Sequence, residues 1–256
     1  MARAAVDNGV ESIVLGGLLF VGSALYASVG QAGASAFVAA MGLVGLPAAT
    51  MRPTALALNI LAAGFSTWRF HVVRRIAWRA LLPFGLASVP CSFLGGAIAL
   101  PDPIYKPVVG VVLMIAAGLL FRRVMAGTAE VEAATRPPGP GVAAAIGGAI
   151  GLLSGLTATG GGVFLSPLLI LLGWMTPRQA VGVAAPFILL NSIAGLAGSA
   201  TLTPQVLPAA FPVYAAVTMA GTILGATIGI RYLPPNVIVL VLGLVLMVSG
   251  VKLVVF

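Results

Sequence analysis

The sequence predicts an all-α polytopic membrane protein with two inverted five-segment repeats, and three observations lead to this prediction. First, 60% of the 256 residues are hydrophobic and only 7% are charged, whereas soluble domains carry about 25% charged residues. Second, apolar segments recur along the whole chain and are apolar all round, which favours helices over a β-barrel. Third, the two halves resemble each other but carry their basic loops at different places. The composition alone excludes a soluble globular enzyme.

The apolar segments fall into two groups of five. The first group lies at about 12–29, 34–46, 53–68, 79–100 and 104–121. The second group lies at about 141–157, 161–173, 179–200, 206–230 and 236–256. We therefore expect a first transmembrane repeat over 1–125, a cytoplasmic linker over 126–140 and a second transmembrane repeat over 141–256.

Two of the segments, 34–46 and 161–173, are too short to cross a bilayer as helices. Thirteen residues span about 20 Å, and the apolar core is about 30 Å thick. Each follows a glycine-rich motif. It either pairs with the preceding segment as a re-entrant or broken hairpin or crosses the bilayer in full. If both behave alike, each half has an odd number of crossings.

The distribution of charge predicts that the halves are inverted. The connection after the third segment is basic and should be cytoplasmic, because it carries Arg69, His71, Arg74, Arg75 and Arg79. The corresponding connection of the second half, residues 201–205, has no charge. The corresponding pairs Leu46-Pro47 and Thr176-Pro177 support an internal repeat. We expect a multi-pass protein of the bacterial inner membrane with both termini outside.

No enzyme is expected, because the groups that catalysis requires are missing or misplaced. His71 is the only histidine, so neither a catalytic triad nor a histidine metal site can form. All five acidic residues lie at segment ends or in the linker, which disfavours a cation substrate. The net charge of +8 reflects cytoplasmic loops and does not indicate nucleic acid. We expect no metal and no cofactor.

Two glycine-rich clusters are the candidate binding site. Each precedes a short segment, where glycine lets the backbone turn and the new helix begins with unsatisfied N–H groups. Two such helix ends, brought together near the midplane, would bind an anion; the alternative is that glycine and serine only pack helices. Two asparagines within the third and eighth segments either bridge helices or face the solute. The candidate substrate-binding residues are Gly30, Gln31, Gly33, Ser35, Asn59, Thr157, Thr159, Gly160, Gly161, Gly162 and Asn191.

The second cluster also carries a resemblance. The run from Thr159 to Pro167, followed by Gly173 to Pro177 and Ala180-Val181-Gly182, resembles the TauE/SafE family of sulfite and organosulfonate exporters. The first cluster departs from the pattern, because the run from Gly30 to Ala34 lacks the triple glycine.

The resemblance implies export of a small sulfur-containing anion such as sulfite, sulfoacetate or a related organosulfonate. We expect a secondary transporter that works by alternating access within the lipid bilayer. The alternatives are an anion channel and a membrane-embedded scaffold subunit of a larger transport complex. The oligomeric state stays open, a homodimer included.

Overall fold

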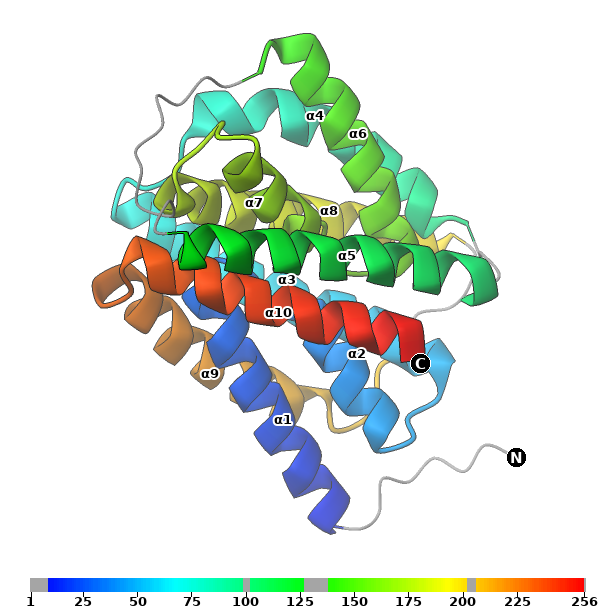
Figure 1. Cartoon of the computed structure of the whole chain (residues 1–256). Helices are drawn as coiled ribbons and strands as arrows, with labels where there is room; N and C mark the ends of the chain where they lie inside the picture. The colour runs from blue at the N-terminus through cyan, green and yellow to red at the C-terminus, as the bar shows by residue number, and fades with distance from the viewer. Residues whose placement is uncertain (1–8, 99–101, 127–137, 202–205, 256) are drawn as a thin grey trace.

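The computed structural model describes residues 9–98, 102–126, 138–201 and 206–255, and all regular structure in this part is α-helical. The helices of the first half are α1 (Gly9–Ser28), α2 (Ala34–Leu43), α3 (Ala48–Val72), α4 (Trp78–Gly96) and α5 (Asp102–Met125). Those of the second half are α6 (Pro140–Thr157), α7 (Gly162–Leu171), α8 (Pro177–Ala200), α9 (Phe211–Arg231) and α10 (Pro235–Val255). Each apolar segment that the sequence predicts coincides with one helix, so the all-helical prediction is confirmed for the described residues (Figure 1).

The boundaries differ most at α9, which begins at Phe211 and not at residue 206, and at α3, which begins at Ala48 and not at residue 53. The helix runs through Arg52 and Pro53, because a proline close to a helix start removes few backbone hydrogen bonds. The predicted linker 126–140 lies mostly outside the described residues, and so does most of the uncharged connection 201–205.

The short helices α2 and α7 each have 10 residues, about 15 Å of helix and half of a bilayer core. α2 folds back along α1. A Cβ atom on Gly33 would lie 3.5 Å from the Cβ atom of Tyr26, and one on Gly22 would lie 3.1 Å from the Cβ atom of Ala36. The sequence order reverses along this contact, so α1 and α2 form an antiparallel hairpin of one long and one short helix.

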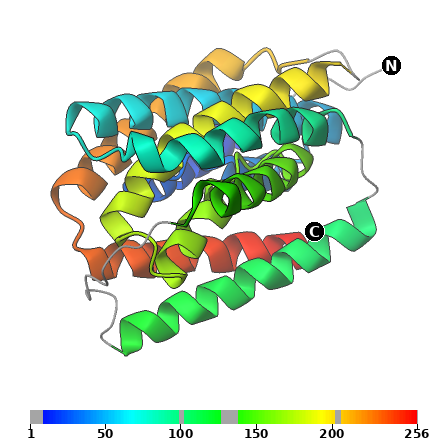
Figure 2. The ribbon, with the colours of Figure 1, turned by 90° about the horizontal axis from the view of Figure 1, so that it is seen from above.

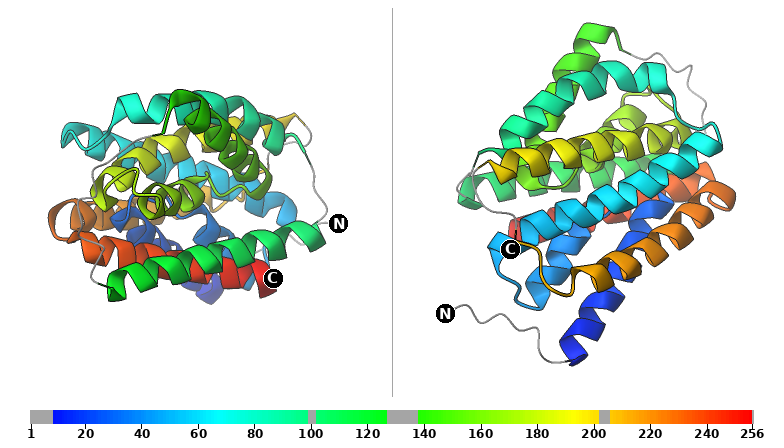
Figure 3. Two further views of the ribbon diagram at one scale, coloured as in Figure 1. Left: turned by 45° about the horizontal axis from the view of Figure 1, so that its top comes forward. Right: turned by 180° about the vertical axis from the view of Figure 1, so that it is seen from behind.

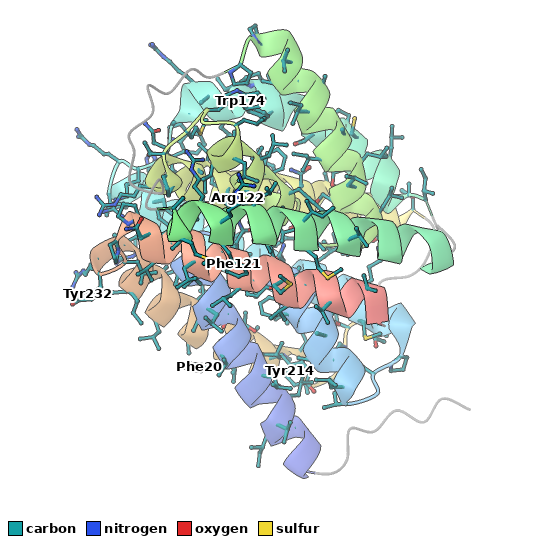
Figure 4. The ribbon with its side chains drawn as sticks, viewed as in Figure 1. Phe20, Phe121, Arg122, Trp174, Tyr214 and Tyr232 are labelled. Carbon is teal, nitrogen blue, oxygen red and sulfur yellow. The ribbon has the colours of Figure 1, made fainter. Side chains whose placement is uncertain are left out.

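Helices of one half pack mainly on helices of the other half. α1 packs on α9, α4 on α6, α3 on α8 and α5 on α10. Figure 2 shows α5 and α10 along one side of the bundle, and Figure 3 shows α3 between α8 and α9 from behind. Where α5 meets α10, the ring of Phe121, labelled in Figure 4, lies on the α10 side of α5. A Cβ atom on Gly243 would overlap this ring. The two halves are therefore interlocked and share their contacts.

Glycines let two of these helix pairs approach backbone to backbone. Cβ atoms on Gly147, Gly151 and Gly155 of α6 would overlap backbone atoms of α4, and Cβ atoms on Gly221, Gly225 and Gly229 of α9 would overlap backbone atoms of α1. Small residues at four-residue spacing are typical of helix contacts in membranes.

The two ends of the bundle are formed by different segments of the chain. The C-terminal end of α5 and the connection between α9 and α10 lie at the left of Figure 1, whereas the C-terminal end of α10 lies at the right. Tyr232 lies at the left-hand end in Figure 4. Within the described residues, α6, α8 and α9 are long and apolar enough to cross a membrane by length and composition.

Candidate functional site

Both short helices begin at a glycine in the left-handed backbone region. The residue before α2 is Gly33, with a φ of 101°, and the residue before α7 is Gly161, with a φ of 78°. Gly30 and Gly160 adopt similar values, 70° and 75°. L-residues rarely adopt this conformation, so glycine makes both turns possible.

The two turns meet through the side chain of Gln31. Its Nε2 atom donates hydrogen bonds to the carbonyl oxygen of Gly162, at 3.1 Å, and to the hydroxyl of Ser166, at 2.9 Å. Gln31 is only 2% exposed. A buried amide thus connects the first glycine turn to the start of α7.

Asn59 of α3 makes a second connection between the halves. Its Oδ1 atom accepts a hydrogen bond from the backbone N–H of Ala34, at 3.1 Å, and its Nδ2 atom donates to the hydroxyl of Ser192, at 2.8 Å. Gly160 lies directly against this amide, because a Cβ atom there would be 2.5 Å from Nδ2 of Asn59. Asn59 therefore caps α2 and touches both α8 and the second turn.

We call the side chains of Gln31, Asn59, Ser166 and Ser192 the polar cluster. All four are buried, and none carries a charge. Asn59 is the twelfth of the 25 residues of α3, about 17 Å from the start of the helix and about 20 Å from its end at 1.5 Å per residue. The polar cluster thus lies near the middle of the long helices, and its amides and hydroxyls offer neutral hydrogen-bonding groups.

Three of the predicted hydroxyls lie beside the polar cluster, not in it. The Ser35 hydroxyl forms a buried triangle with the hydroxyls of Tyr26, at 2.8 Å, and Ser249, at 3.0 Å, and Tyr26 also contacts Ser249 at 2.8 Å. The hydroxyls of Thr157 and Thr159 lie 2.8 Å apart. These groups therefore flank the two turns.

Asn191 also lies outside the polar cluster. Its Nδ2 atom donates to the carbonyl oxygen of Phe187 in its own helix, at 2.8 Å, and its buried Oδ1 atom has no hydrogen-bond partner among the described residues. Asn191 is the fifteenth residue of α8, whereas Asn59 is the twelfth of α3. The twelfth residue of α8 is Ile188, so the two asparagines do not occupy matching positions.

Ser166 and Ser192 belong to the polar cluster but not to the predicted candidates, and Ser166 shows what the sequence could have signalled. It is the fifth residue of α7 and lies within the motif from Thr159 to Pro167 that carries the family resemblance. A hydroxyl in an otherwise apolar helix needs a partner, and this was the available signal. The identity of that partner, Gln31, depends on how the halves pack.

Arg52 lies outside the polar cluster and binds backbone carbonyls at two helix ends. Its Nη2 atom donates to the carbonyl oxygen of Gly155, at 2.6 Å, and lies 3.4 Å from that of Gly96. These carbonyls belong to the last turns of α6 and α4, where a cation offsets the negative end of the helix dipole. Arg52 thus fastens two helix ends together.

The bundle exposes many large apolar side chains. Inside it, two half-length helices begin at glycine turns and are joined by buried amides. These features define a helical membrane protein with an internal polar site, as found in membrane carriers. The chain belongs to the sulfite exporter TauE/SafE family, whose family model matches residues 14–253. The family prediction is confirmed, and the chain is a multi-pass membrane transporter.

One relative supports this assignment over the full length. The chain is 39% identical over 243 residues to "Probable membrane transporter protein y4hK" of Sinorhizobium fredii (strain NBRC 101917 / NGR234). The match covers 95% of this chain and 98% of the relative. No solved structure matches the chain.

Proposed function

We propose that the protein is a secondary carrier of the bacterial inner membrane that exports a small sulfur-containing anion, such as sulfite, sulfoacetate or a related organosulfonate. The observation that carries this proposal is the polar cluster, where Gln31 and Asn59 join the two glycine turns in the middle of the bundle. No acidic residue occurs in the sequence between residues 12 and 101 or after residue 132. The sulfur chemistry comes from the family.

The bound anion would replace contacts that the polar cluster makes within the protein. The Nε2 atom of Gln31 and the Nδ2 atom of Asn59 each donate to a protein oxygen, and the anion's oxygens would accept these donors. Hydrogen bonds to a charged group contribute about 1.5–3 kcal/mol each. The start of α7 adds the positive end of a helix. The flanking candidates are Gly30, Gly33, Ser35, Thr157, Thr159 and Asn191.

Alternating access would arise from one repeat rocking against an inverted copy. The helix pairs support this reading: exchanging the halves turns the pair α1–α9 into α6–α4 and maps the pairs α3–α8 and α5–α10 onto themselves. A two-fold axis in the plane of the membrane would produce this pattern. We take 1–125 and 141–256 as the two repeats.

A substrate panel in proteoliposomes tests the function. The purified chain should take up sulfite or an organosulfonate with saturable kinetics, show counterflow, and leave neutral controls outside. Unitary currents in a planar bilayer would instead indicate the anion channel. No flux of any panel member by the chain alone would contradict the carrier and favour the scaffold subunit.

A further inference from the structure

A second group of polar side chains lies away from the polar cluster, at the end of α3. Arg74, Arg75 and Arg178 line a depression of about 330 Å³ together with Ile76, Ala77 and Gln179. The residues from 74 to 77 connect α3 to α4, whereas Arg178 and Gln179 begin α8. Each half of the chain thus contributes to one concave surface.

The backbone holds these arginines in place. Arg74 has a φ of 54°, one of two positive values among the described non-glycine residues, and such a conformation persists only where the surroundings fix it. The N–H groups of Arg74 and Arg75 donate to the carbonyls of His71 and Phe70, each at 2.9 Å. The Arg75 carbonyl packs on Gly182, where a Cβ atom would overlap it. The loop is therefore seated on α8.

The depression concentrates positive charge. Among the residues that the structure describes, none forms an ion pair or a hydrogen bond with the guanidinium groups of Arg74, Arg75 and Arg178. Burial lowers the pKa of Arg75 below its ordinary value, and the positive charge of Arg178 lowers this pKa further. The two cations therefore repel each other, and an anion between them would remove the repulsion.

The depression also lies close to the first glycine turn. Val181 follows Arg178 by three residues of α8, about 5 Å along the helix. A Cβ atom on Gly30 would lie 2.5 Å from the Val181 carbonyl oxygen, and Gln31 of the polar cluster is the next residue. One turn of α8 therefore separates the arginines from the turn that carries Gln31.

We propose that this depression binds a small oxyanion, a sulfonate, sulfite, sulfate or phosphate group, between Arg75 and Arg178. The guanidinium fork matches the oxygens of such groups, and Ile76 and Ala77 offer an apolar wall to a short carbon chain. The oxyanion comes either from a free solute or from the headgroup of an anionic lipid. A role of this site in delivering the transported anion to the polar cluster rests on the proposed function. The binding of the oxyanion itself does not.

Binding is tested by calorimetry on the purified full-length chain, depleted of lipid in a neutral detergent, with sulfate and methanesulfonate as probes. Arg75→Gln and Arg178→Gln should each weaken binding at least about 10-fold, since each removes a charge-assisted hydrogen bond. Arg79→Gln is the matched control. Arg79 is exposed at the start of α4, close in sequence to the depression but not part of its lining. Arg79→Gln removes the same charge and should change the affinity less than about 2-fold.

The lipid source is tested in nanodiscs of phosphatidylcholine and phosphatidylglycerol. Native mass spectrometry should show phosphatidylglycerol retained by the wild type and lost in Arg178→Gln if a headgroup fills the depression. Equal weakening by all three substitutions would show a diffuse field and overturn the site. So would a result in which neither sulfate binding nor lipid retention depends on Arg75 and Arg178.

The same variants in proteoliposomes separate this proposal from the transport function. Arg178-dependent sulfate binding by a chain that transports nothing would leave the site standing and contradict the carrier. If the chain transports, and both Arg75→Gln and Arg178→Gln keep wild-type binding and wild-type KM, the oxyanion site is overturned and the carrier stands.

Discussion

The two glycine turns contribute different chemistry to the place where they meet. The first turn carries alanine at Ala32 and Ala34, where the second has Gly160 and Gly162 at a shift of 128 residues. A Cβ atom on Gly160 would lie 2.5 Å from Nδ2 of Asn59, and one on Gly162 would lie 2.7 Å from Oε1 of Gln31. Both amides belong to the first half. The first half thus supplies the amides, and the second half supplies the bare backbone on which they rest.

This difference explains why the triple glycine occurs only once. Ile188 occupies in α8 the position that Asn59 occupies in α3, the twelfth residue. The start of α2 is capped by Asn59, whereas the start of α7 faces Ile188 and the side chain of Gln31. The site is therefore asymmetric, and the second turn leaves no room for side chains at Gly160 and Gly162.

The largest expected effect concerns the inversion on which the comparison of the two turns depends. Single cysteines at Val73 and Val206, in a Cys91→Ser background, should react with a membrane-impermeant maleimide from opposite faces. Both valines are exposed, at 37% and 57%, and replacing them leaves every topology-determining charge in place. Labelling is read in right-side-out and inverted vesicles. Reaction of both cysteines from one face would contradict the inverted repeats.

The helices and both turns could be predicted from the sequence, because they depend on local properties. Apolar runs fix the helices, and glycines fix the turns before α2 and α7. The partners of Gln31 could not be predicted, since Gly162 and Ser166 lie more than 130 residues away and are brought close only by packing between the halves.

Asn59 and Asn191 do not occupy corresponding positions for a related reason. The connection before α3 spans four residues, 44–47, and that before α8 spans five, 172–176. Counted from the first residue of each helix, the longer connection places Ile188 opposite Asn59, and Asn191 lies three residues further on. A register set by loop length is not visible in the apolar pattern of the helices.

The second prediction tests whether the second turn must stay bare. Gly160→Ala should abolish transport and lower the thermal unfolding midpoint, because the added Cβ atom would meet Asn59, Ile188 and the hydroxyl of Ser192, at 2.5, 2.6 and 2.9 Å. Thermal unfolding is followed by size-exclusion chromatography in detergent, and transport by substrate flux in proteoliposomes.

Gly173→Ala is the matched control for this substitution. Gly173 has a φ of 68°, close to the 75° of Gly160, but nothing lies within 4 Å of the place where its Cβ atom would be. Both substitutions carry left-handed strain of about 1–2 kcal/mol, and only Gly160→Ala adds overlap with the polar cluster. Equal losses of transport and of thermal stability in the two variants would show that backbone strain alone matters. The absence of side chains at the second turn would then have no role.

The third prediction compares the two asparagines. Asn59→Ala leaves the N–H of Ala34 and the hydroxyl of Ser192 without their present partner, and each buried unsatisfied group costs about 1–3 kcal/mol. Asn191→Ala removes a bond to a carbonyl of its own helix, so we expect a loss below about 1 kcal/mol. Transport should fall at least about 10-fold in Asn59→Ala and less than about 3-fold in Asn191→Ala. A larger effect at Asn191 than at Asn59 would contradict the polar cluster as the binding site and favour a site around the Asn191 side chain.

The smallest expected effect is the coupling between Gln31 and Ser166, the bond that joins the first turn to α7. Gln31→Leu and Ser166→Ala each remove the 2.9 Å contact between Nε2 and the hydroxyl. Gln31→Leu also leaves the carbonyl of Gly162 without this donor, so it should destabilise the protein more than Ser166→Ala. In a double-mutant cycle the two effects should fall short of additivity by about 1 kcal/mol, the net value of one buried hydrogen bond. Unfolding midpoints measure the coupling without substrate, and repeating them with sulfite shows whether the ligand replaces this bond. If sulfite occupies the polar cluster, the coupling should shrink when it is present, because the Gln31 amide then donates to the anion. A coupling that is unchanged by saturating sulfite would show that this bond only holds the two turns together, and the anion would have to bind elsewhere.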